Sequence, residues 1–148
     1  MIFAMTEHEL APDILDLLTD VDPDALEVVL LDQPQAECPV THHFGPDVYI
    51  REVFIPAGSI VVGHAHKGEN LNIMLKGRMA LLVDGQVSIV EAPFMKVASP
   101  GRKVAVAIED TVWQNVYATN ETDIDKLDAM FVEKSPAWLA HHNVGAIT

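Results

Sequence analysis

The sequence predicts a mainly β protein, built as an antiparallel sandwich or jelly-roll barrel with short helices at both ends. Eight short apolar runs follow one another closely between residues 48 and 118. In one of them, Leu71, Ile73 and Leu75 alternate with Asn70, Asn72 and Met74, a period of two that is typical of a strand. Asp84-Gly85 stands between two such runs, and glycine supplies the positive φ that a tight hairpin turn needs. Short strands separated by turns favour a two-sheet antiparallel fold.

The expected strands begin with one long run and end with a run rich in aromatic and polar side chains. Their ranges are 48–55, 60–66, 71–76, 79–83, 87–92, 94–98, 104–108 and 111–118. The runs 79–83 and 104–108 are apolar on both faces, so they need cover outside the barrel as well as packing inside it. Terminal helices or a neighbouring subunit could supply that cover.

Helix signals flank the strands. A capping-box pattern at 6–9, followed by Pro12, predicts a short amphipathic helix that ends near Leu18. Asp22-Pro23 gives a second helix start, although the β-branched residues of 25–31 leave helix and strand both open. Residues 33–46 are rich in proline and read as a loop. Acids at 122–125 predict a helix to about residue 133, and Pro136 separates it from a tail.

A length of 148 residues fits one domain. Within it we expect an acidic helical extension and loop over 1–47, a barrel over 48–118, and a C-terminal helix and tail over 119–148. The N-terminal part is expected to lie against one sheet.

Charge and hydropathy exclude several classes of partner. The formal net charge is −13, and the first fifty residues hold eleven of the 22 acids and no Lys or Arg. Such a segment repels phosphate backbones, so no nucleic-acid partner is expected; it is either a solvated face or a docking surface for a basic partner. No apolar run approaches the roughly 20 residues of a membrane helix, and no secretory leader is recognised. The single cysteine, Cys38, receives no role.

His64 and His66 carry the main site hypothesis. On an extended backbone two residues apart project from the same face, so both imidazoles could bind one divalent transition-metal ion. Glu69 or Asn70 could add an oxygen, and our predicted ligand set is His64, His66 and Glu69. The alternative is that both imidazoles are satisfied by the backbone or solvent and hold no ion.

The stretch around the histidines resembles the first motif of the cupin family. Gly58, His64, His66 and Gly77 match that motif at its spacings. The resemblance covers roughly residues 48–118 and implies a cupin-type jelly-roll barrel. It carries over His64 and His66 as the metal ligands.

The family's remaining ligands are not matched. Asn70 stands where the family has a glutamate, and Glu69 comes one residue early, which on a strand turns a side chain to the opposite face. In the stretch that corresponds to the second motif, Val104 stands where the family's fourth ligand, a histidine, would be. The site is therefore degenerate by comparison with the family.

Other polar and aromatic residues are weaker candidates. A pocket lining or ordinary core is expected for Trp113, Gln114, Asn115, Tyr117, Asn70, Asn72 and Met74. Adjacent histidines in loops are more often incidental than ligands, which applies to His42, His43, His141 and His142. Surface ion pairs, or the binding of an anion, are the alternatives for Arg51, Arg78 and Arg102.

A narrower resemblance is to the small cupin-like proteins of tailed bacteriophages. It rests on His64-x-His66-x-x-Glu69, on Lys76-Gly77-Arg78, and on the run from Glu109 to Trp113. It implies a non-catalytic structural or interaction protein that forms a homo-oligomer, meets other virion proteins, and resides in the virion or host cytoplasm. The alternative is a metal-dependent dioxygenase, isomerase or lyase that acts on a small polar substrate through His64 and His66. No catalytic residue and no further cofactor are assigned.

Overall fold

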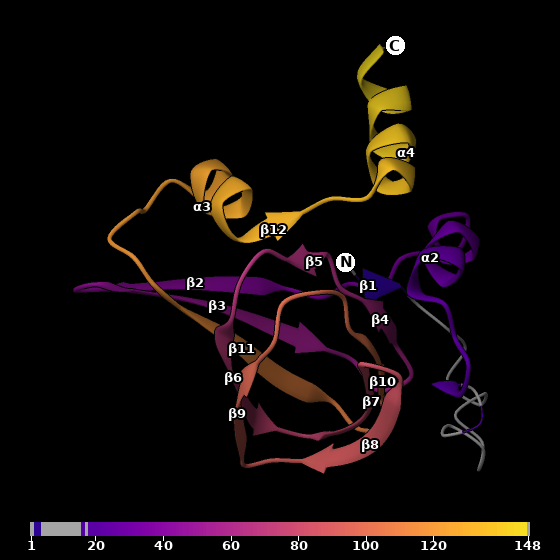
Figure 1. Ribbon diagram of the computed structural model, residues 1–148, viewed down its shortest axis with the longest axis horizontal. Coiled ribbons are helices and arrows are strands. Elements are labelled where there is room, and N and C mark those ends of the chain that lie inside the picture. Colours follow the sequence, from indigo (N-terminus) through magenta and orange to yellow (C-terminus); the bar gives the residue numbers. More distant parts are fainter. Residues whose placement is uncertain (1, 4–15, 17, 148) are drawn as a thin grey trace.

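The computed structural model describes residues 2–3, 16 and 18–147, and its core is two antiparallel five-stranded sheets (Figure 1). Sheet A has the order β1 (Ile2–Phe3), β4 (Ile60–Val62), β10 (Val104–Ala107), β7 (Arg78–Val83) and β8 (Gln86–Glu91). Sheet B has the order β2 (Val40–Gly45), β3 (Val48–Ile55), β11 (Thr111–Ala118), β6 (Asn70–Lys76) and β9 (Phe94–Ala98). A small third sheet pairs β5 (Ala65–His66) with β12 (Val132–Glu133). The predicted mainly β antiparallel jelly-roll with short terminal helices is confirmed.

Three helices are described, namely α2 (Pro23–Leu31), α3 (Ile124–Phe131) and α4 (Pro136–Ile147). The carboxylate of Asp22 accepts a hydrogen bond from the amide of Asp24 and caps α2, so of the two alternatives for this segment the helix is correct. The α3 helix is capped in the same way by Asp123. In Figure 1, α3 and β12 lie across one end of the barrel, while α2 lies beside β1 and β4. The helix predicted to end near Leu18 falls almost wholly outside the described residues.

Sheet A is covered on both faces. Its inner face contributes Met79, Leu81, Ala105 and Ala107 to the barrel core. Its outer face contributes Ala80, Leu82, Val104 and Val106 to a second core, which Leu18, Leu30 and Leu31 complete from the N-terminal segment. The expectation that the N-terminal part lies against a sheet is confirmed. The chain's own helical segments therefore supply the outside cover that β7 and β10 require.

The hairpin between β7 and β8 turns at Asp84 and Gly85, which have φ values of 50° and 77°. Both values are positive, as a two-residue hairpin of this type requires, so the predicted turn is confirmed. None of the described helices is long and apolar enough to cross a membrane.

Three segments differ from expectation. The predicted strand 60–66 is interrupted at Gly63 and His64, because the chain leaves sheet A there to pair with β12. The loop expected over 33–46 is wrong for Val40–Gly45, which forms the edge strand β2. Most side chains of β2 are exposed, so its sequence lacks the regular apolar positions by which a strand is recognised. The tail expected after Pro136 is also wrong, because proline occupies the first turn of α4, where its missing N–H costs nothing.

Candidate functional site at the end of the barrel

A cavity of about 400 Å³ lies between the two sheets, with walls that also come from the C-terminal segment. Sheet B contributes three alternate cross-strand pairs to its lining, and these are Tyr49–Tyr117, Arg51–Asn115 and Val53–Trp113. The wall therefore changes from aromatic hydroxyls, through charged and amide groups, to an apolar floor. A volume of this size, with apolar walls and few polar groups, is characteristic of small-molecule sites.

His64 and His66 both line this cavity, as the sequence predicted. The ring of His64 meets the ring of Trp138 from α4 edge to face, with centroids 5.2 Å apart. The Nδ1 atom of His64 is buried and has no hydrogen-bond partner among the described residues. It is therefore a polar atom in the cavity wall whose hydrogen bonding the described protein does not satisfy.

His66 is held by an amide network. Its Nδ1 lies 3.1 Å from the Asn70 side-chain nitrogen and 3.3 Å from the Tyr117 hydroxyl. Asn115 donates to the side-chain oxygens of Asn70 and Asn72 at 3.1 and 2.8 Å. Because the Asn70 amide nitrogen can only donate, His66 Nδ1 accepts, and the neutral ring carries its proton on Nε2.

Burial makes both cavity histidines neutral at physiological pH. Burial lowers the pKa of His64 to about 4. Burial also lowers the pKa of His66 to about 4, and the nearby charges of Lys103 and Arg51 add to that effect. The imidazoles are thus hydrogen-bonding groups in the cavity rather than cations.

The described residues do not fit a three-ligand metal centre. Glu69 is exposed to solvent between β5 and β6, and does not line the cavity. The inward position belongs to Asn70, which is 6% exposed. In the described part of the chain, no group of three His, Cys, Asp or Glu side chains is placed to hold a metal ion. The predicted ion at His64, His66 and Glu69 stays a prediction, and the cavity offers it two imidazoles.

In the stretch that corresponds to the family's second motif, the residue that faces the cavity is Lys103 and not Val104, the residue at the ligand position. Val104 is fully buried in the outer core of sheet A and does not line the cavity. Its neighbour Lys103 does line the cavity, as does Ala105, because alternate residues share a face. A lysine therefore lies in the wall near the position where the family would supply its last histidine.

The other residues that the sequence suggested fall into two groups, those that line the cavity and those that do not. Trp113, Asn115, Tyr117 and Asn72 line the cavity, whereas Gln114 points outward and donates to Glu52 at 2.7 Å. His42 lines the cavity with its Nδ1 2.7 Å from the Tyr49 hydroxyl, while His43 lies 3.5 Å from Glu52. His142 stacks on Trp138 with centroids 3.7 Å apart. Arg51 lines the cavity, and Arg78 makes a surface pair with Glu91.

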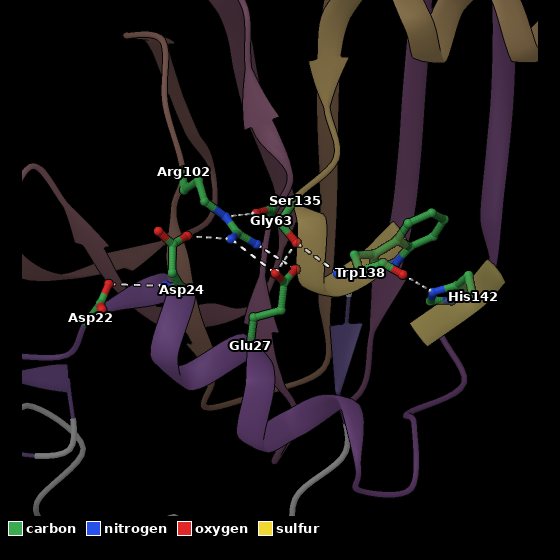
Figure 2. Close-up of polar contacts among 8 residues, drawn as sticks. All are labelled: Asp22, Asp24, Glu27, Gly63, Arg102, Ser135, Trp138 and His142. Carbon is green, nitrogen blue, oxygen red and sulfur yellow. Dashed lines mark hydrogen bonds and ion pairs between the residues drawn. The ribbon is translucent and has the colours of Figure 1, made fainter. Parts of the chain in front are cut away.

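Arg102 forms a buried clamp beside the cavity (Figure 2). It donates to both carboxylate oxygens of Glu27 on α2, at 3.2 and 2.7 Å, and to the Gly63 carbonyl at 2.9 Å. Ser135, just before α4, donates a short hydrogen bond to Glu27. Burial alone would raise the pKa of Glu27, but the bonds from Arg102 and Ser135 outweigh it and lower the pKa. The clamp fixes the segments that carry His64 and Lys103.

Sequence reasoning missed most of the cavity wall after residue 118. Asp128, Phe131, Lys134 and Trp138 all line the cavity, and Lys134 pairs with Asp128 at 2.6 Å. The acids at 122–125 predicted a helix here, but nothing in the sequence shows that it covers the cavity.

Comparisons with known proteins find similarity to solved structures alone. No family model matches the chain, and no curated protein matches it. Similar solved structures include a cupin superfamily protein of Desulfitobacterium hafniense, with 12% identity, TM-score 0.48, and coverage of 62% of this chain and 86% of that one. KdgF from a Halomonas species has 15% identity, TM-score 0.47 and coverage of 60% and 81%. A predicted oxalate decarboxylase of Thermotoga maritima has 16% identity, TM-score 0.47 and coverage of 57% and 83%.

Over part of its length, the chain is similar to these solved structures, and one of them is described as a cupin superfamily protein. Identities this low describe the fold alone and carry no ligand or reaction to this chain. The narrower resemblance to phage proteins stays a prediction.

Proposed function

We propose that the protein is a non-catalytic binding domain of cupin type, whose barrel cavity holds a small organic ligand. The observation that carries the proposal is the cavity itself. Its volume of about 400 Å³ is lined by aromatic rings, amides and the imidazoles of His42, His64 and His66. Groups of this kind orient a ligand, while no three His, Cys, Asp or Glu side chains among the described residues are placed together as the ligands of an open catalytic metal site would be.

A cavity-filling variant tests this proposal. Ala105 is a small residue on the inner face of β10 and lines the cavity, so Ala105→Phe should occupy ligand space. Thermal-shift screening against neutral and charged small molecules should find ligands that raise the melting temperature of the native protein. Those shifts should be lost in Ala105→Phe and kept in Ala118→Phe, a matched control at the exposed end of β11.

Metal analysis of the same preparations separates this reading from the enzyme alternative. Ligand shifts that survive Ala105→Phe would place binding outside the cavity. About one divalent ion per chain, lost together with a turnover in His64→Ala/His66→Ala, would instead favour a metal-dependent enzyme.

A second candidate function is the oligomeric building block, in the phage particle that the sequence resemblance implies. The observation that favours self-association is an apolar strip on the outer face of sheet B. Met95 and Val97 on β9 are 63% and 56% exposed, and they pair across to Ile73 and Leu71 on β6. Burying such surface contributes roughly 25 cal/mol per Å², whereas leaving it in water favours aggregation.

Solution mass measures this association. If the strip is an interface, multi-angle light scattering should give an integral multiple of 16.2 kDa. The variant Met95→Lys/Val97→Lys should shift the mass towards the monomer, whereas Ile89→Lys on β8, a control that is 41% exposed, should not. A monomeric native protein, absent from purified particles, would remove this second candidate.

A further inference from the structure

Two basic side chains line the cavity from opposite sheets. Arg51 lies on β3 in sheet B, and Lys103 precedes β10 in sheet A. Both are only partly exposed, and neither has an ion pair or a side-chain hydrogen bond with another described residue. The third cation of the wall, Lys134, is neutralised by Asp128 at 2.6 Å. The described wall therefore carries a net positive charge, although the whole chain carries a formal charge of −13 and the charge of Asp84 acts on Lys103 without forming an ion pair with it.

The hydrogen bonding of His66 adds a donor to these charges. Since Asn70 donates to Nδ1, the neutral ring presents an N–H at Nε2. A protonated ring nitrogen cannot bind a metal cation, but it can donate to an oxygen anion. With Asn70 oriented in this way, the Nε2–H of His66 is available as a hydrogen-bond donor.

The rest of the wall suits an apolar ring. Val53 and Trp113 lie one cross-strand pair below Arg51 and Asn115. On the other side of that pair, the rings of Tyr117 and Phe131 are stacked with centroids 4.2 Å apart. Rings stack on such faces, and a buried cation favours a carboxylate through charge-assisted hydrogen bonds.

We propose that the cavity binds a small organic carboxylate whose anionic group lies between Arg51 and Lys103 and whose ring packs on the aromatic wall. This inference rests on the proposed binding function and names its ligand class. The carboxylate supplies the negative charge that the two cations lack, and its oxygens accept from donors fixed by the fold. A metal ion has no part in this recognition.

Benzoate and benzamide are a matched pair of probes, because they share a ring and differ in charge. NMR titration at pH 7.5 would follow the indole N–H of Trp113 and the side-chain amide of Asn115, both in the cavity wall. Benzoate should bind on the order of tenfold more tightly than benzamide. Arg51→Met and Lys103→Met should each remove that preference by weakening benzoate alone. Arg78→Met, a surface control, should leave it unchanged.

The outcomes are distinct. Equal affinity for both probes, or a benzoate preference that survives both cavity variants, overturns the carboxylate inference and leaves the binding function standing. If neither probe shifts the Trp113 and Asn115 signals, while neutral ligands from the thermal screen do, only the carboxylate inference fails. If no small molecule shifts them, the inference and the proposed function fail together. Two single variants are used so that poor folding of one leaves the other informative.

Discussion

Replacing Glu27 with alanine should lower the free energy of unfolding by about 3–5 kcal/mol, because it leaves the guanidinium of Arg102 without its main partner. The side chains of Glu27 and Arg102 are 1% and 13% exposed, so water cannot replace the lost carboxylate at little cost. Urea unfolding followed by circular dichroism measures the loss. Because domains of this size are stable by about 5–15 kcal/mol, Glu27→Gln provides a milder version that should stay folded.

The chain offers a matched control on the same guanidinium. Asp24 accepts from Arg102 at 2.8 Å, but its side chain is 79% exposed. Asp24→Ala should therefore cost less than about 1 kcal/mol. Similar losses in Asp24→Ala and Glu27→Ala would contradict the buried clamp. A double variant Glu27→Leu/Arg102→Met should lose less than Glu27→Ala alone, since no charge is left buried.

Acid should destabilise the protein between pH 6.5 and 4 through the cavity histidines. Their ordinary pKa is 6.5, and burial lowers the pKa of His64 and of His66 to about 4 in the folded protein. In this window the unfolded chain binds more protons, so stability is present above pH 6.5 and is lost as the pH falls towards 4. With a discount for partial exposure, each histidine contributes on the order of 2 kcal/mol to that loss.

Unfolding curves at pH 7, 6 and 5, after treatment with EDTA, measure how steeply the free energy of unfolding falls with pH. His64→Gln/His66→Gln should flatten this slope, whatever the variant does to stability at pH 7. His43→Gln is the control, because His43 lies on the outer face of sheet B with its side chain 47% exposed. An unchanged slope in the double variant would show that other groups cause the acid sensitivity.

Local patterns predicted much of the fold. Short apolar runs between turn residues predicted the barrel strands, and Asp84-Gly85 predicted a hairpin, because these signals depend on neighbours in sequence. Strand β2 was missed because an edge strand buries only part of one face and prolines surround it. The break at Gly63 and His64 was missed because its cause is β12, far along the chain.

The candidate site was predicted only in part, because much of it is formed by residues that are far apart in sequence. The spacing of His64 and His66 was enough to place both on the cavity wall. Lys103 was missed although the start of β10 was predicted, because the run 104–108 is apolar on both faces and its pattern does not show which alternate residues face the cavity. The pairing of Glu27 with Arg102 joins elements that no sequence period relates, so only the folded chain shows it.

The clamp in Figure 2 also bears on how long the protein stays folded. Ser135 and Glu27 are 108 residues apart in sequence, so their contact closes a loop that contains strands β2 to β12. Loop-closure entropy disfavours such a contact before the intervening strands have paired. We therefore expect it to form late, so that its free energy slows unfolding more than it speeds folding. The lifetime of the folded barrel then depends in part on a hydrogen bond between the two terminal segments, outside the barrel itself.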